Sequence, residues 1–214
     1  MSTTPPSTAE RILDAAEALF ANKGYDGVSV RAITDLAGVR LNLLSYHFGS
    51  KAALFEAVID RRLDVLNERR RTALAALASR KATPSVEDVL VAFIRPYLEL
   101  AARGGPGWIS YTRLISQICQ SDVHSPLLET HMKETLNLFL DALFQALPQA
   151  DRKDLTRGFY FTIALMVSAF SGAGRIDGLV QGQLDDDALD AAYRPLLTYS
   201  TAGLLSLCGR PEDR

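Results

Sequence analysis

The segment Ser29-Val-Arg-Ala-Ile-Thr-Asp-Leu-Ala-Gly-Val39 has the pattern of a helix-turn-helix. Its apolar residues recur at the spacing of one helix face, and Ala37 is small enough for a second helix to cross closely. Gly38 permits a positive φ in the turn that follows. We therefore expect a short helix over residues 30–36, a tight turn, and a second short helix over residues 40–46.

The second of these helices has the side chains of a DNA-reading helix, which would lie in a major groove. Arg40 and Asn42 can hydrogen-bond to base edges, and Leu41 or Leu43 can touch a thymine methyl. Phosphate contacts are expected from Ser29, Arg31, Ser45, Tyr46, His47 and Lys51. No acidic residue occurs from Arg40 to Lys51. The alternative is a plain three-helix bundle in which Gly38 is only a turn glycine.

Helical periodicity recurs along the rest of the chain, and no alternating run is long enough for a strand, so the expected fold is all-α with about nine helices. Ser7 and Glu10 form a capping box for a first helix that ends at Gly24. Ser50 can cap the fourth helix, and Thr83 before Pro84 would start the fifth. The later helices are expected over residues 51–79, 83–103, 107–120, 125–147, 151–174 and 185–208, with kinks at Pro96 and Pro195.

The composition is that of a globular protein. Among 214 residues, 48% are hydrophobic and 22% charged, and the net charge of −2 means that any nucleic-acid site must be local. Cys119 and Cys208 form no motif and are expected to be reduced thiols in the core rather than a disulfide. The apolar stretch 159–173 is too short to span a membrane, and the N-terminus lacks a signal peptide, so a cytoplasmic location is expected.

Several spaced motifs between residues 10 and 60 resemble one known family. They are Glu10-Arg-Ile-Leu-Asp-Ala-Ala-Glu-Ala-Leu-Phe20, then Lys-Gly-Tyr25, Ser29-Val-Arg-Ala-Ile33, Ala-Gly-Val39, Tyr46-His-Phe-Gly-Ser-Lys51 and Leu-Phe55. Together they are similar to the N-terminal domain of the tetracycline-repressor (TetR/AcrR) family of transcriptional regulators.

The resemblance implies a helical dimer with a helix-turn-helix DNA-binding domain in residues 1–50 and an effector-binding and dimerisation bundle in residues 51–214. It places phosphate contacts at Ser29 and Arg31, backbone contacts over residues 46–51, and a core aromatic at Phe48. The reading helix of this chain departs from that of the family. The commonest family sequence at this place is Ser-Lys-Gly-Thr-Leu-Tyr, and this chain has Ser45 where that sequence has the tyrosine. Endings of the Asn-Tyr-His-Phe-Gly-Ser-Lys type resemble a subgroup in which some members respond to fatty acids or their coenzyme A esters.

An effector pocket is expected among the later helices, because the core of a helical bundle is a usual place for a ligand. Arg113 or Arg175 could pair with an anionic effector. The alternative is that the aromatic residues only fill the core. The residues proposed to line the pocket are Trp108, Tyr111, Arg113, Ile118, Phe139, Phe161, Met166, Phe170 and Arg175.

Two further groups have a functional and a plain interpretation. His124 and His131 lie seven residues apart, but a metal site would need more ligands, so neither a metal nor a cofactor is expected. The arginines 61, 62, 69, 70 and 71 could contact DNA. We favour a solvated helix face paired with Asp60, Asp64 and Glu68.

The last two helices are rich in small and apolar residues, and they are expected to form a four-helix interface with a second copy or to contribute to the internal core. No paired carboxylates, activated nucleophile or phosphate-binding loop indicates an enzyme. The sequence therefore predicts a homodimeric regulator, a repressor released from a palindromic operator by a small apolar or amphipathic effector. The alternative is a helical small-molecule-binding or adaptor protein without operator binding.

Overall fold

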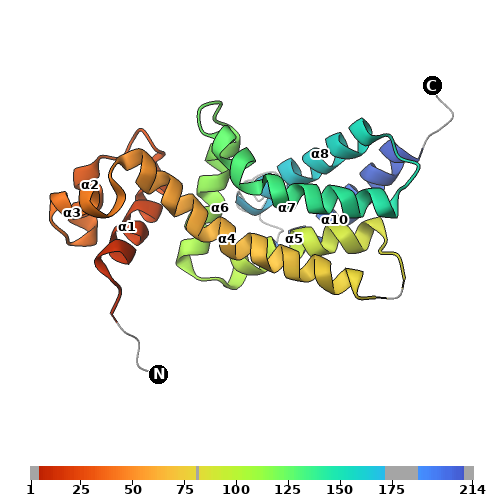
Figure 1. The fold of residues 1–214 in the computed structure, drawn as a ribbon, viewed down its shortest axis with the longest axis horizontal. Helices are drawn as coiled ribbons and strands as arrows, with labels where there is room; N and C mark the ends of the chain where they lie inside the picture. The colour runs from red at the N-terminus through yellow and green to blue at the C-terminus, as the bar shows by residue number, and fades with distance from the viewer. Residues whose placement is uncertain (1–4, 81, 172–187, 210–214) are drawn as a thin grey trace.

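The computed structural model describes residues 5–80, 82–171 and 188–209, and over these ranges it contains nine α-helices and no strand (Figure 1). The all-α prediction is confirmed. The acidic run 185–187 and residues 172–174, which the sequence placed in two helices, lie outside the described residues. The helices are α1 (Thr8–Lys23), α2 (Val30–Ala37), α3 (Leu41–Phe48), α4 (Lys51–Ala78), α5 (Val86–Arg103), α6 (Pro106–Cys119), α7 (Ser125–Ala146), α8 (Arg152–Ser171) and α10 (Ala188–Cys208).

The helix starts follow from their capping residues. Ser7 and Glu10 form the expected capping box of α1, and the Ser50 Oγ accepts a hydrogen bond from the Ala53 amide at the start of α4. The predicted start of α5 was wrong. Ser85, not Thr83, is its N-cap, because the Asp88 carboxylate three residues later accepts from the Ser85 amide and completes a capping box.

The first three helices pack as one small unit at one end of the molecule (Figure 1). Ile12, Phe20, Ile33 and Leu44 are almost completely buried at its centre. Gly38, at the end of α2, has a φ of 64° and a ψ of 39°, the left-handed conformation that its position in the turn requires. The helix-turn-helix geometry expected for this segment is therefore present.

The long helix α4 joins this unit to the remaining helices and packs against α1, α5, α6 and α7 (Figure 1). Its buried stripe contains Leu54, Phe55, Val58, Ile59, Leu63 and Leu66, as expected. Helix α1 also packs extensively against α6. The first three helices are thus connected to the rest of the protein through α4, which follows them in the chain, and through α6.

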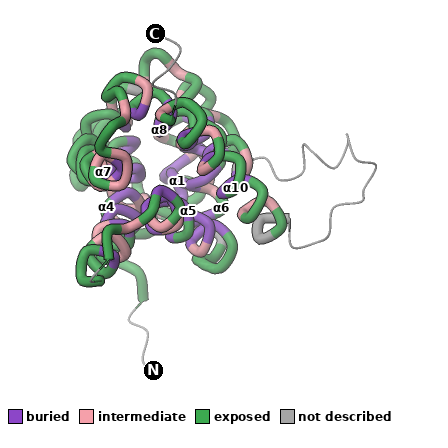
Figure 2. The backbone as a smooth tube through the Cα atoms, turned by 90° about the vertical axis from the view of Figure 1, so that its right-hand side faces the viewer, coloured by how far each residue is buried: buried purple, intermediate pink, exposed green. Residues whose placement is uncertain are grey.

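Helices α4 to α8 and α10 form a bundle whose buried residues gather on the inner sides of the helices (Figure 2). Helices α5 and α10 continue through Pro96 and Pro195. Both cysteines are free thiols, but Cys119 is exposed, so its expected place in the core was wrong. Within the described ranges, no helix has the combined length and apolar character that a membrane span needs.

Candidate nucleic-acid interface and effector site

Helix α3 presents most of its predicted DNA-reading residues to solvent. Arg40, Asn42, Ser45 and His47 are exposed, and so are Leu41 and Tyr46. Leu44 is the buried anchor that holds the helix on its own unit, and Leu43 packs partly against the same core. Leu41 has 55% of its surface accessible, so it is the more exposed of the two leucines predicted to touch a thymine methyl.

The residues proposed to contact phosphate flank α3. Ser29 caps α2 by accepting a hydrogen bond from the Ala32 amide at 3.1 Å, which leaves its hydroxyl hydrogen free to donate. Arg31 is exposed on the first turn of α2. The Lys51 Nζ lies 4.2 Å from the centroid of the Tyr25 ring. This cation–π contact, which the sequence did not predict, fixes the direction of the lysine beside α3.

A buried carboxylate on α1 connects the first three helices to α4. Glu17 is only 2% exposed and accepts hydrogen bonds from both Arg61 and Arg62, and Arg61 also bonds to Asp14 at 2.7 Å. The expectation that these two arginines pair within their own helix face was wrong. Their partners lie more than forty residues away in the chain, where helical spacing gives no signal.

Helix α6 contacts the same ion-pair network. The Arg62 guanidinium carbon lies 5.2 Å from the Trp108 ring centroid, and a Cβ added at Gly107 would lie 2.0 Å from the Arg62 Nη2. A larger residue at position 107 would therefore require the ends of the Arg62 and Glu17 side chains to shift. The network thus joins α1, α4 and α6 at the boundary between the two parts of the molecule.

Arg70 also departs from the expected solvated face, because its side chain is completely buried in the bundle. Its Nε donates to the Phe93 carbonyl oxygen at 3.0 Å, and its guanidinium carbon lies 3.7 Å from the Phe93 ring centroid. Burial lowers its pKa to about 10, so it remains charged at neutral pH. Of the five arginines, Arg71 forms the expected pair with Glu68, at 2.8 Å.

The structure brings together most of the residues proposed to line an effector pocket. Met166 contacts Arg70, Phe170 stacks on Tyr97, and Phe139 meets Phe93 edge-on. Two other proposed residues, Arg113 and Phe161, are exposed, and Arg175 lies outside the described residues. The proposed residues that are buried are Trp108, Tyr111, Ile118, Phe139, Met166 and Phe170.

Tyr97 and Tyr111 add two buried phenols to this aromatic cluster. Burial raises the pKa of both far above the ordinary tyrosine range, so both stay neutral, and the charge of Arg70 acts on each. The Tyr97 hydroxyl has no hydrogen-bond partner among the described residues. Tyr111 was among the residues predicted to line a pocket, but Tyr97 and Arg70 were not. Both continue the buried stripe of their helix, since Arg70 follows Leu66 by four residues and Tyr97 follows Phe93 by four, but their residue types are usually found at least partly exposed.

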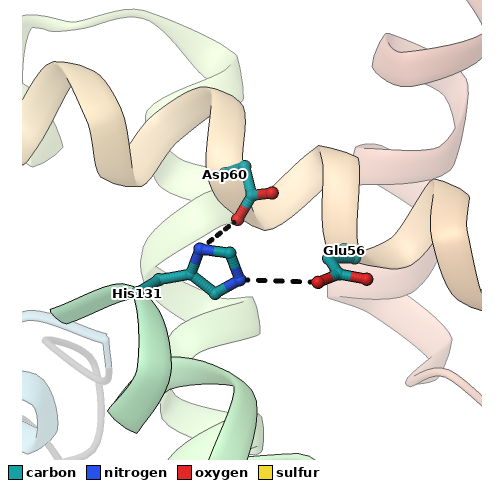
Figure 3. A group of neighbouring side chains, drawn as sticks. All are labelled: Glu56, Asp60 and His131. Atoms are coloured by element: carbon teal, nitrogen blue, oxygen red, sulfur yellow. Dashed lines mark ion pairs between the residues drawn. The ribbon is translucent and has the colours of Figure 1, made fainter. Parts of the chain in front are cut away.

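A second charged cluster joins α4 to α7 (Figure 3). The His131 Nδ1 lies 3.0 Å from the Asp60 Oδ1, and its Nε2 lies 3.6 Å from the Glu56 Oε1. Both carboxylates lie on α4, about seventy residues before His131 in the chain, so the spacing around His131 gave no sign of them. Three ligand atoms lie within 4.8 Å of one another, but the imidazole turns a different nitrogen toward each carboxylate, as in an ion-pair bridge rather than a set of ligands converging on one ion.

Asp60 in this cluster makes the free energy of unfolding depend on pH. Burial raises the pKa of Asp60, and Glu56 and Asp64 add to this effect while His131 opposes it. The folded state therefore holds the proton more tightly than the unfolded chain, and stability falls as pH rises through the Asp60 pKa.

We expect Asp60→Asn to raise the free energy of unfolding at neutral pH, by less than about 1 kcal/mol because the site is partly exposed. The gain should vanish near pH 3, where the aspartate is protonated in both states. Thermal denaturation at both pH values, with Asp141→Asn on exposed α7 as the control, measures the effect. A loss of stability at neutral pH would mean that the pair with His131 outweighs the cost of burial.

An apolar groove lies between α8 and α10, where these helices face solvent. It has a volume of about 470 Å³ and is lined by Phe161, Leu165, Tyr199 and small residues that include Ala202 and Gly203. Tyr199 is 70% exposed and Phe161 49%. The same helices also contribute to the core, through buried Phe159 and Met166 on α8 and buried Leu196 and Leu197 on α10.

Helices α8 and α10 also pack closely on each other. Gly158 lies against Leu204, because an added Cβ would come within 2.7 Å of the Leu204 Cδ2. Residues 172 and 173 lie outside the described residues.

Two family models match the sequence. The model described as "Bacterial regulatory proteins, tetR family" matches residues 12–58. The model described as "Tetracyclin repressor-like, C-terminal domain" matches residues 91–203, which is just over half of the chain.

The named relatives that match the sequence are transcriptional regulators. The HTH-type transcriptional repressor BdcR of Escherichia coli is 45% identical over 51 residues, which is 24% of this chain and 26% of that protein. The probable HTH-type transcriptional regulator YttP of Bacillus subtilis is 32% identical over 88 residues, 41% of each chain. The chain thus spans well under half the length of both. The HTH-type transcriptional activator FasR of Mycolicibacterium smegmatis is 25% identical over 163 residues, 76% of this chain and 69% of FasR.

Solved structures share the whole fold. The fatty acid degradation regulator FadR from Bacillus halodurans superposes with a TM-score of 0.67 over 95% of this chain and 98% of its own, at 17% identity. The ketosteroid transcriptional regulator KstR2 of Mycobacterium tuberculosis gives a TM-score of 0.62 over 94% and 96%, at 20% identity. At these identities the likeness concerns the fold.

Proposed function

Because the chain belongs to the tetR family of bacterial regulatory proteins, we propose that it is a DNA-binding transcriptional regulator, a repressor that a small apolar or amphipathic effector releases from a palindromic operator. The family consists of regulatory proteins rather than enzymes. We assign DNA binding to residues 1–50, and effector binding and dimerisation to residues 51–214.

The observation that carries the proposal is the exposed face of α3. Arg40, Leu41 and Asn42 stand at its N-terminal end, the end that reads bases when such a helix enters a major groove. Ser29, Arg31 and Lys51 lie on elements beside it and supply donors for phosphate oxygens. Base-reading and backbone-binding groups thus occupy one surface at the end of the molecule.

Dimerisation through α8 and α10 is supported by the apolar groove between them. Large exposed apolar side chains on a monomer's surface indicate an interface, and small residues such as Gly203 let helices of a second copy approach closely. A two-fold dimer would present two copies of α3 to half-sites about 34–36 Å apart, one turn of DNA.

Selection of genomic fragments by the purified protein, followed by a gel-shift assay on the selected DNA, tests operator binding. We expect a palindromic fragment whose affinity falls steeply with salt. Failure to prefer any fragment over random DNA would contradict the proposal. A reporter gene placed behind the selected fragment then shows whether the protein represses or activates transcription. Both kinds occur among the relatives, since BdcR is named a repressor and FasR an activator.

Alanine substitutions separate base reading from phosphate binding. Arg40→Ala and Asn42→Ala are each expected to cost about 1–3 kcal/mol on the selected operator and to relax base preference at one position. Lys51→Ala should weaken binding to all sequences alike and reduce the salt dependence. Quantitative gel shifts on operator and scrambled DNA make the comparison. An equal loss on both DNAs for all three variants would show that Arg40 and Asn42 do not read bases.

A further inference from the structure

Arg70 is a buried cation without a counter-ion in the described part of the protein. The guanidinium carries five N–H donors, and its Nε donates to the Phe93 carbonyl oxygen. Its Nη2 has only the Met166 Sδ, a weak acceptor, at 3.8 Å. Its Nη1 is buried and has no acceptor among residues 5–80, 82–171 and 188–209. Most of its hydrogen-bonding capacity is therefore unused.

In the described part of the protein, the groups around Arg70 do not include an anion that could form an ion pair with it. Within the described residues, the ionisable groups that interact with Arg70 are the phenols of Tyr97 and Tyr111. Burial raises the pKa of both phenols, so neither carries a charge that could pair with the guanidinium. Buried charges in proteins are otherwise paired, because removing a lone charge from water is costly. A completely buried, unpaired arginine thus indicates that the anion it binds comes from elsewhere.

We propose that the effector carries a carboxylate, which binds the Arg70 guanidinium and accepts a hydrogen bond from the Tyr97 hydroxyl inside the bundle. This proposal rests on the proposed function, in which the bundle takes an effector. The Tyr97 hydroxyl is itself buried and has no partner in the described structure, so one ligand group would satisfy both side chains.

The chemistry of the cluster favours a carboxylate on an apolar body over an inorganic anion. A guanidinium offers parallel N–H groups that match the two oxygens of a carboxylate. The side chains around it are aromatic or thioether: Phe93 and Met166 contact Arg70, and Phe170 stacks on Tyr97. An inorganic anion would lose its hydration without gaining apolar contacts, whereas an acyl or aromatic carboxylate would gain them.

The chain contains a reporter for this site. Trp108 is the only tryptophan, and its ring meets Tyr111 edge-on at 5.4 Å between centroids. Tyr111 in turn is one of the two phenols on which the charge of Arg70 acts. Binding beside Arg70 should therefore change the intrinsic tryptophan fluorescence without any added label.

The test titrates the full-length protein, free of DNA, with octanoate, decanoate, dodecanoate and phenylacetate, and with the matching alcohols. Binding is followed by Trp108 fluorescence and by calorimetry. We expect saturable binding of at least one carboxylate, tighter than its alcohol by about tenfold or more. Absence of saturable binding by every carboxylate, or equal binding of the alcohol, would overturn the proposal.

Variants locate the binding group. Arg70→Met is expected to fold, because an apolar side chain suits this site, and to lose about tenfold or more in carboxylate affinity. Tyr97→Phe removes only the unpartnered hydroxyl and should weaken binding by a smaller factor. Arg69→Met, on the exposed side of the same helix, is the matched control and should bind like wild type. Wild-type affinity in Arg70→Met would overturn the proposal, and Arg70→Lys, which keeps the charge, serves if the methionine variant fails to fold.

A gel shift on the selected operator keeps this proposal separate from the proposed function. Release of the operator by the carboxylate, and not by its alcohol, supports both. Release by neutral molecules alone would refute the carboxylate while leaving the regulator intact. A protein that binds carboxylates through Arg70 but binds no operator would refute the regulator instead.

Discussion

Glu17→Ala is expected to lower the free energy of unfolding by about 3 kcal/mol, the largest stability effect that we predict for a single substitution. Removing the carboxylate leaves two guanidiniums, those of Arg61 and Arg62, without their shared partner. Breaking a buried pair in this way costs about 3–5 kcal/mol, and the lower value applies here because both arginines keep some contact with water. Urea denaturation at a fixed protein concentration measures the change.

Asp14→Ala is the matched control for Glu17→Ala. Asp14 bonds to the same Arg61, but 63% of its side chain is exposed, so its removal should cost less than about 1 kcal/mol. Equal losses for the two variants would show that burial of Glu17 does not govern the network. The operator affinity of both variants should also be measured, because Glu17 holds α1 on α4 and thereby sets the position of α3.

Leu165→Glu is expected to separate the dimer and to reduce operator affinity by about 10²- to 10⁴-fold. A charge placed on the apolar groove of α8 and α10 would be buried in the proposed interface. Each monomer would then bind a single half-site and lose the effective concentration that linkage of two sites provides. Sedimentation equilibrium and gel shifts on the selected operator measure the two effects.

Leu138→Glu on α7 separates this effect from a general effect of a surface charge. Leu138 and Leu165 have nearly the same exposure, 40% and 38%, but Leu138 lies outside the α8–α10 groove. We expect Leu138→Glu to remain dimeric and to bind DNA like wild type. A dimeric Leu165→Glu protein with wild-type affinity would place the interface on another surface.

The local features of the fold could be predicted because they depend on neighbouring residues. The Ser7–Glu10 capping box, the left-handed Gly38 and the buried stripe of α4 each involve residues within a few positions of one another. The start of α5 shows the limit of this reasoning. Thr83 before Pro84 is as reasonable a start as Ser85, and the Asp88 side chain decides between them by completing a capping box at Ser85.

The candidate sites depended on contacts between distant residues, so sequence reasoning reached them only in part. Consecutive arginines read as one solvated surface, yet Arg70 turns into the core while Arg69 stays exposed. The difference is one position on the helix, about 100° of rotation, and the packing of α5 and α8 determines which side is inside. Likewise, nothing in the spacing indicated that Glu17 would meet Arg61 and Arg62.

The unbroken length of α4 has a mechanical consequence. Arg70 lies nineteen residues after Lys51 on the same helix, a distance of about 29 Å at 1.5 Å per residue. In the proposed function, α4 would act as a lever between the effector site and the DNA-binding helices, because a small tilt of a long helix moves its far end by a larger distance. A tilt of about 5° moves the far end by about 2.5 Å, and two such arms in a dimer change the separation of the reading helices by about 5 Å, against a half-site spacing of about 34 Å. In the proposed dimer, a ligand beside Arg70 that tilts α4 by this amount would move the two reading helices out of register with consecutive turns of DNA.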